Sequence, residues 1–388
     1  MKLKSTKNFF AGIALASMAA VSGTAAAFDL NNCNGTGLAC PWVTYGDGNS
    51  YSLALNAYIY DAAQGGGTGP SNPFFVQSSP GQISSLIVNA TGSSGNPIVT
   101  NFPNMDNAYP TPSGVNGTTF FSMNKTAYGQ PLTGNPPAYP ADPGGAGQFT
   151  GDLANSWDTK VSALQAFLGA GNTPIFFFNN NQTSSGATTN QDIAVWAQIT
   201  LTDSTGANAA KIFDFTNTLN PFAEPSLVPL DPRFMGNPGA YSSTGSGPVA
   251  GDNTSTDYVF SGGRLCILPG TPYPVLMENL ADGSCPAGTI TINNNLGANQ
   301  AAYAVVFPEL NAFLLAGGYD SMHVDLRFGC DPNTAAGSCI GRDANNGYEQ
   351  LFIASAAGVT VPEPATLALL GLGLMGLALS RRKARPVA

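Results

Sequence analysis

The segment Ser321-Met322-His323-Val324-Asp325-Leu326-Arg327-Phe328 places three groups capable of acid–base chemistry at alternate positions. On a β-strand, His323, Asp325 and Arg327 would line one face, and the other would be lined by Met322, Val324, Leu326 and Phe328. A histidine beside a carboxylate can act as a general acid or base. The same row also fits a solvated strand face with cross-strand ion pairs, and we favour that interpretation.

The sequence offers few other routes to catalysis. His323 is the only histidine, and no G-x-S-x-G motif accompanies it, so a serine hydrolase is not predicted. Glycoside hydrolysis needs only two carboxylates, and Glu278 and Glu309 are the acids least clearly directed to solvent. No spacing pairs them. We therefore assign no catalytic residue, and a secreted glycan-active enzyme using paired carboxylates remains the alternative.

A cation site is conceivable in the stretch from Asp343 to Glu349. Asp343, Asn345 and Glu349 offer oxygen ligands around a glycine turn, but the spacing is not that of an EF-hand. Segments rich in Asp and Asn usually form simple turns. We predict no bound cofactor, with calcium at this segment as the alternative.

Aromatic and amide side chains suggest contact with sugars. The run Phe176-Phe177-Phe178-Asn179-Asn180-Asn181-Gln182 ends an apolar stretch in amides. Trp42, Trp157 and Trp196 are further candidates, and Trp196 is expected on the outward face of its strand. The alternative, which we favour, is a buried strand end and scattered core aromatics.

Six cysteines fall into three pairs that are close in sequence. Metal binding would need C-x-x-C spacing or several histidines, and the chain has neither. An exported chain meets an oxidising compartment, so we predict three local disulfides, although six cysteines permit 15 pairings. The predicted pairs are Cys33 with Cys40, Cys266 with Cys285, and Cys330 with Cys339.

The elements that would position these residues are mainly strands. Apolar residues alternate cleanly from Tyr51 to Ile59 and from Ile193 to Leu201, with turns rich in Gly, Asn, Pro and Ser between segments. This rhythm predicts an all-β, mainly antiparallel, sandwich-like fold. Further expected strands are 83–88, 175–178, 211–215, 258–268, 289–292, 302–307, 322–328 and 348–353.

One short amphipathic helix is predicted, because Trp157, Val161, Leu164 and Leu168 repeat with helical spacing between a Ser156 N-cap and Gly169. Residues 103–150 and 219–256 are expected to be long irregular loops. Neither half of the chain has a complete set of strands, so residues 28–358 are interpreted as one elaborated β-rich domain.

The ends of the chain read as sorting signals. Lys2, Lys4 and Lys7 precede an apolar stretch and small residues at Ala25, Ala26 and Ala27. That is the layout of a signal peptide over residues 1–27, cleaved after Ala27 at a small-x-small site that includes Ala25.

The C-terminal 359–388 segment combines a Pro-Glu-Pro motif, a short apolar helix at 365–379 and a basic tail at 381–385. Such a helix is about 22 Å long, too short for a comfortable single transmembrane span, and basic residues after it should stay cytoplasmic. The motif residues are Pro362, Glu363, Pro364, Arg381, Arg382 and Lys383. Together they resemble the PEP-CTERM signal. This resemblance implies transient residence in the inner membrane of a Gram-negative bacterium, cleavage by an exosortase and delivery to the cell surface or extracellular matrix.

Charge restricts the partners of the body between these ends. The chain has 14 basic and 23 acidic residues; three bases precede residue 28, and four bases and one acid follow residue 358, leaving 7 bases, 22 acids and a net charge of −15. Such a body would repel nucleic acid. Charged residues make up only 10% of the chain, against about 25% in typical domains, so amides and hydroxyls supply its polar surface. We predict a non-enzymatic surface or matrix protein associated with exopolysaccharide, with a self-assembling structural subunit as a further alternative.

Overall fold

The computed structural model describes most of the predicted body. Its described residues are 29–78, 86–91, 102–111, 120–123, 149–153, 156–169, 171–181, 193–215, 259–261, 264–269, 275–276, 285–297, 299–329 and 349–355. The predictions for the signal peptide, the sorting segment, Glu278, Cys330, Cys339, Asp343 and Asn345 lie outside them.

The central layer is a seven-stranded sheet in the order β1-β2-β14-β7-β16-β3-β4. Its neighbouring strands run antiparallel, except for the parallel pair β3–β4. The strands are β1 Val43–Tyr45, β2 Gly48–Ser52, β14 Tyr303–Val306, β7 Pro174–Phe178, β16 Leu351–Ser355, β3 Leu86–Thr91 and β4 Tyr109–Thr111.

A second, six-stranded sheet is entirely antiparallel and is built around the long pair β8–β15. Strands β9 and β10 pair with β8, and β5 and β6 pair with β15. The bounds are β8 Ile193–Thr202, β15 Ser321–Gly329, β9 Lys211–Phe215, β10 Val259–Ser261, β5 Phe120–Ser122 and β6 Trp157–Lys160. A mostly antiparallel β-fold was therefore correctly predicted.

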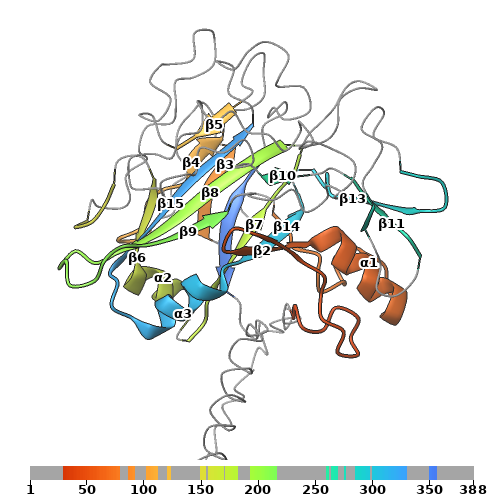
Figure 1. Cartoon of the computed structure of the whole chain (residues 1–388), viewed down its shortest axis with the longest axis horizontal. Helices are drawn as coiled ribbons and strands as arrows, with labels where there is room; N and C mark the ends of the chain where they lie inside the picture. The colour runs from red at the N-terminus through yellow and green to blue at the C-terminus, as the bar shows by residue number, and fades with distance from the viewer. Residues whose placement is uncertain are drawn as a thin grey trace, which may run out of the picture.

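Both faces of the seven-stranded sheet are buried (Figure 1). Strand β7 illustrates this, because Phe176 and Phe178 face the six-stranded sheet, whereas Ile175 and Phe177 belong to a second core. That second core includes α1 (Leu53–Gln64), the Cys33–Cys40 pair and a small sheet. The small sheet has the order β12-β11-β13, with β12 Val275–Leu276, β11 Arg264–Ile267 and β13 Ile290–Asn293.

The expected strand from Tyr51 to Ile59 is wrong beyond Ser52. Ser52 ends β2 and caps α1, its Oγ accepting a hydrogen bond of 3.1 Å from the Leu55 backbone N–H. The helix packs on the second core and buries Leu53, Leu55, Ala57 and Ile59, so alternating apolar residues are buried without a strand. Its content of Leu and Ala favours the helix.

The helix expected from Trp157 is half correct. Residues Trp157–Lys160 form β6, and only Val161–Leu168 form helix α2, which ends at Gly169 with φ of 89°. Val161, Leu164 and Leu168 are buried as predicted. The first four residues form a strand despite their helical periodicity, because they pair with β15. On this strand Asp158 lies on the face opposite Trp157.

A third helix, α3 (Pro308–Ala316), was not predicted. Pro308 stands at its first turn, and Gly317 ends it with φ of 78°. The Gln165 side chain of α2 donates a 2.8 Å hydrogen bond to the Leu314 carbonyl of α3, so the two helices lie side by side at one end of the sheets (Figure 1). Of the helices in the described ranges, none has the length and apolar content that crossing a bilayer requires.

Candidate functional site

The row His323, Asp325 and Arg327 does line one face of β15, as predicted. Met322, Val324, Leu326 and Phe328 face the core between the two large sheets. Across the ladder, His323 lies opposite Thr200 and Asp158, Asp325 opposite Gln198, and Arg327 opposite Trp196. Strands β6, β8 and β15 thus bring three distant segments of the chain to one polar face.

This polar face is not solvated, which corrects the expectation from the sequence. The exposed fractions are 3% for His323, 7% for Asp325 and 0% for Arg327. Gln198 and Trp196 on the neighbouring strand are also buried. Buried charges must be paired, so these residues serve the fold through specific contacts.

Arg327 is held on two sides. Its Nη2 donates a 2.8 Å hydrogen bond to Asp325 Oδ2, and its guanidinium carbon lies 4.2 Å from the centre of the Trp196 ring. The planar guanidinium can stack on an aromatic ring and bind a carboxylate at the same time. Trp196 faces outward from its sheet as predicted, but the arginine contact and its burial remove it as a sugar platform.

His323 lies between a carboxylate and a hydroxyl. Its Nδ1 is 2.9 Å from Asp158 Oδ1, and its Nε2 is 2.8 Å from Thr202 Oγ1. Asp158 Oδ1 also accepts a 2.6 Å hydrogen bond from Ser156 Oγ, and Asp158 Oδ2 accepts one from the Leu153 backbone N–H. The Asp158 carboxylate therefore contacts the His323 ring, the Ser156 side chain and the Leu153 backbone together.

The order carboxylate, imidazole, hydroxyl is that of a hydrolytic relay. Such a relay also needs N–H donors beside the hydroxyl to stabilise an oxyanion. Beside Thr202, the Asp320 N–H donates to the Thr202 carbonyl at 3.0 Å, and the Ser204 N–H donates to Asp320 Oδ1 at 3.2 Å. These donors are already used and His323 is buried, so the geometry favours a structural role.

Three carboxylates of this region could hold a metal ion. Asp106, Asp152 and Asp158 each offer an oxygen, and these oxygens lie within 4.8 Å of one another. Oxygen donors of this kind suit a hard cation such as calcium. Protein donors already occupy several of these oxygens, because Asp106 Oδ2 accepts a 2.8 Å hydrogen bond from the Asp158 N–H, and Asp158 has the three contacts described above.

Sequence reasoning missed Asp106, Asp152, Asp158 and Thr202. Their segments carry no shared motif. The pairing of β6 and β8 with β15 brings Asp158 and Thr202 to His323, and the Met105–Thr159 bridge brings Asp106 to Asp158. One signal was available: the alternation of Trp157, Asp158 and Thr159, if read as a strand, would have turned Asp158 away from the core with His323.

Glu349, a candidate ligand in the calcium alternative, is completely buried just before β16. Burial raises the pKa of its carboxyl from 4.5 to about 8. Asn89 orders the backbone around it: its Nδ2 donates to the Glu349 carbonyl at 3.0 Å, and its Oδ1 accepts from the Leu351 N–H at 2.8 Å. The Asn89 amide thus replaces a peptide group at an irregularity in the β3–β16 pairing. Calcium at this segment stays the alternative to the prediction of no bound cofactor.

Glu309, the predicted carboxylate that the structure describes, lies exposed in the first turn of α3. A carboxylate there complements the positive end of the helix. It stands apart from Asp106, Asp152 and Asp158, which the strand pairings of β6 gather elsewhere.

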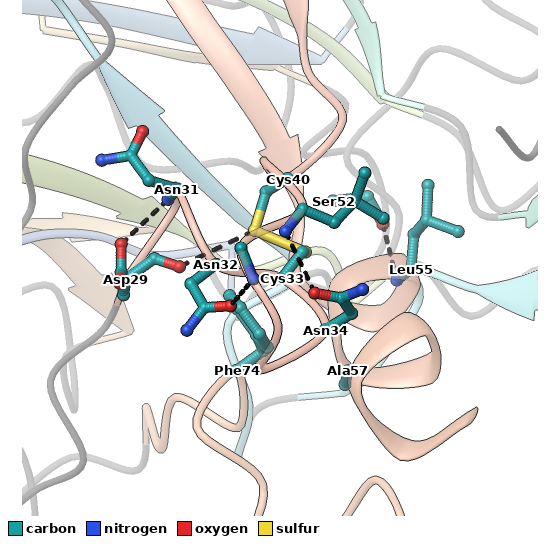
Figure 2. Close-up of a disulfide and its surroundings, with 12 residues drawn as sticks. Asp29, Asn31, Asn32, Cys33, Asn34, Cys40, Ser52, Leu55, Ala57 and Phe74 are labelled. Atoms are coloured by element: carbon teal, nitrogen blue, oxygen red, sulfur yellow. Dashed lines mark hydrogen bonds between the residues drawn. A yellow bond between two sulfur atoms is a disulfide. The ribbon is translucent and has the colours of Figure 1, made fainter. Parts of the chain in front are cut away.

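The N-terminal loop is the second region with candidate binding residues. Cys33 and Cys40 form a disulfide, as predicted, and so do Cys266 and Cys285. Figure 2 shows the first disulfide beside Ser52, Leu55 and Phe74, and both its cysteines are fully buried in the second core.

Trp42 lies just beyond this disulfide and is 43% exposed. Its ring centre is 5.9 Å from that of Tyr51, which is 1% exposed and whose pKa burial raises to about 12. Trp157 and Trp196 are buried. The favoured interpretation, core aromatics, is confirmed for Trp157 and Trp196, and of the three tryptophan candidates Trp42 alone could meet a ligand from solvent.

Two family matches account for most of the chain. Residues 30–327 match the family described as Domain of unknown function (DUF8239), and residues 360–383 match the PEP-CTERM protein-sorting motif. No curated protein and no solved structure shows significant similarity to the chain.

Proposed function

The chain belongs to the DUF8239 family and ends in a PEP-CTERM sorting motif, and on this premise we propose that its body is a non-catalytic surface protein that attaches to the exopolysaccharide of its host. The sorting motif implies processing by an exosortase-type protease, export and cell-surface sorting in a Gram-negative bacterium. The attachment and the absence of catalysis are the proposed parts.

The observation that carries the proposal is the use of the acid–base residues within the fold. Both ring nitrogens of His323 contact protein groups, and Arg327 is paired with Asp325 and stacked on Trp196. A general base must reach the proton that it removes. These side chains instead join β6, β8 and β15, which supports a scaffold.

Surface chemistry supports a sugar polymer as the partner. Charged residues are only 10% of the chain, and its polar surface comes from amides and hydroxyls. These groups donate and accept hydrogen bonds as sugar hydroxyls do. The acidic body would be repelled by polyanions such as nucleic acid.

The test starts with the protein recovered from its native host. Intact mass in membrane, surface and medium fractions should give a chain that begins at Phe28 and ends near Pro362. Reduction should raise the mass by about 6 Da for three disulfides. Recovered protein should then be retained on immobilised host exopolysaccharide.

Two results would overturn the proposal. A protein that passes every exopolysaccharide fraction of its host unretained does not attach to this polymer. Hydrolysis of that polymer by the purified protein, lost in Glu278→Gln or Glu309→Gln, would instead identify a glycan-active enzyme.

A further inference from the structure

We propose that Trp42 is the stacking platform of a subsite for a neutral, hydroxyl-rich polysaccharide, built on the Cys33–Cys40 loop. This inference rests on the proposed attachment to exopolysaccharide and gives it a location and a ligand class.

The indole of Trp42 is partly exposed and has a buried aromatic neighbour. Trp42 is 43% exposed, while its neighbour Tyr51 is almost completely buried and stands 5.9 Å away between ring centres. Tyr51 belongs to β2 and to the second core, so it is a fixed support. A sugar ring presents C–H groups on its faces, which pack on an exposed aromatic surface.

The chain on both sides of Trp42 is restrained. Cys40 is tied to Cys33, Pro41 has a fixed φ, and Val43 begins β1 in antiparallel pairing with Ser50. Residues that are rigid before binding lose less conformational entropy when the ligand docks. A tryptophan held in this way offers a large contact area at low entropic cost.

Amide donors are built into the same loop. Asn32 Oδ1 accepts from the Gly37 N–H at 2.7 Å, and Asn34 Oδ1 accepts from the N–H groups of Thr36 and Leu38 at 2.9 and 3.1 Å. These bonds fix the planes of both amides and leave their Nδ2 groups as donors, a function that suits sugar hydroxyls. The Asn34 carbonyl accepts from Gln64 Nε2 at 2.8 Å, which anchors the loop to α1.

The Cys33–Cys40 loop exposes a second large apolar side chain. Leu38 is 39% exposed and lies on the same loop, between the asparagines and Cys40. Exposed apolar groups gathered on one surface segment usually mark a site of interaction. Leu38 and Trp42 supply apolar surface for the C–H faces of a sugar, and Asn32 and Asn34 supply amide donors for its hydroxyls.

The charge of this segment selects a neutral ligand. Residues 29–50 contain no Lys or Arg, and their charged side chains are those of Asp29 and Asp47. Anionic sugars such as uronates need a cationic partner to offset their desolvation, and this loop has none to offer. A neutral hexose polymer meets no such penalty.

The experiment measures retention of full-length protein, matured in its native host, on three immobilised probes: the neutral and the anionic fractions of the host exopolysaccharide, and dextran. Wild type should bind the neutral fraction, and Trp42→Ala should weaken that binding at least tenfold. Trp42→Phe, which keeps a ring, should restore most of it. Leu315→Ala removes the most exposed of the described large apolar residues, on α3, and is the matched control that should bind as wild type.

The outcomes separate the two proposals. If wild type binds and Trp42→Ala binds equally, the subsite is elsewhere, although the attachment stands. If wild type binds no fraction, the proposed function itself is wrong. Preference for the anionic fraction would overturn the ligand class. A wild-type dimer that becomes monomeric in Trp42→Ala would assign the patch to a second copy of the chain. Equal thermal unfolding of both proteins excludes misfolding as the cause of lost binding.

Discussion

Two regions of the molecule differ in which kinds of side chain they bury and which they expose. The polar face of the six-stranded sheet carries His323, Arg327, Asp158 and Asp325, with Asp106 and Asp152 on adjoining loops, and most of these groups are buried. The Cys33–Cys40 loop carries little that could react, yet it presents Trp42 and Leu38 to solvent. The residues that could react are therefore buried contacts within the fold, and the exposed apolar residues form the candidate binding surface.

The physical reason lies in the cost of burial. A charged group removed from water persists only when it is paired, and each pairing specifies how strands meet. The sheet face uses this cost to fix β6, β8 and β15 in register. The loop obtains its rigidity from a disulfide, a proline and backbone capping, which leaves its side chains available.

The largest expected effect is the loss of stability when Asp158 is replaced, and its absence would contradict the difference between the two regions. Asp158→Ala removes the acceptor for Ser156 Oγ and the Leu153 N–H, and with it the carboxylate that lies 2.9 Å from His323 Nδ1, at a completely buried position. The free energy of unfolding should fall by about 3 kcal/mol. Urea unfolding of the full-length protein measures it.

Asp203 provides the matched control for Asp158. It accepts hydrogen bonds from the N–H and Oγ1 of Thr205 and from the N–H and Nδ2 of Asn208, in an exposed turn. Its bonds compete with water, so Asp203→Ala should have a much smaller effect than Asp158→Ala. Equal losses would show that burial does not distinguish the two carboxylates.

Removing the N-terminal disulfide should have the next largest effect. The Cys33→Ser, Cys40→Ser double variant opens a short loop, and the chain-entropy argument gives a loss of about 2.5 kcal/mol. Because the loop supports Trp42, binding to neutral exopolysaccharide should weaken at temperatures where the body remains folded. Unchanged affinity would show that binding at Trp42 does not depend on the disulfide.

Glu349 should make stability depend on pH. An unfolded glutamate titrates near 4.5, whereas burial holds the folded group at about 8. The folded state keeps its proton over this window while the unfolded state releases it, so stability falls as pH rises from about 4.5 to 8. We expect a decrease of about 2 kcal/mol, because local opening relieves part of the burial cost.

Glu349→Gln carries no titrating group and should flatten this profile in unfolding experiments between pH 5 and 8. Glu309→Gln, on the exposed first turn of α3, is the control that should reproduce the wild-type profile. A wild-type profile without this slope would contradict a buried, protonated Glu349.

Chelation should have the smallest effect. Protein donors already satisfy the Asp158 carboxylate and one oxygen of Asp106, so removal of calcium with EDTA should change the free energy of unfolding by less than about 0.5 kcal/mol. A loss above about 1 kcal/mol, reversed by added calcium and absent in Asp152→Asn, would make the carboxylate group a cation site.

Local patterns predicted part of the strands and few of their partners. The single strand expected at 258–268 is wrong, because β10 and β11 belong to different sheets, and β4 and β5 lie in the segment 103–150 that was expected to be an irregular loop. Alternation identified β8, β9 and β15 almost to the residue, because each has a core face and a polar face. The alternation at 51–59 wrongly predicted a strand, because residues on several sides of helix α1 are buried. The helical spacing from Trp157 wrongly predicted a helix over β6, because these residues pair with β15.

The candidate site depends on long-range register, which no local pattern contains. His323 was visible as a chemical group, but its neighbours come from residues 102–106, 149–160 and 193–202. The polar face also looked solvated, because alternation describes which face a residue occupies and not what covers it. The two short-range disulfides were predictable, since chain proximity alone favours them.

The central claim is that the reactive face is structural and the disulfide loop is functional. Its most direct test compares Trp42→Ala with His323→Gln for retention on the neutral exopolysaccharide fraction and for urea unfolding. Our account predicts that Trp42→Ala loses binding at least tenfold with unchanged unfolding, while His323→Gln unfolds more easily and still binds when folded. The reverse pattern, with binding lost in folded His323→Gln and retained in Trp42→Ala, would contradict it.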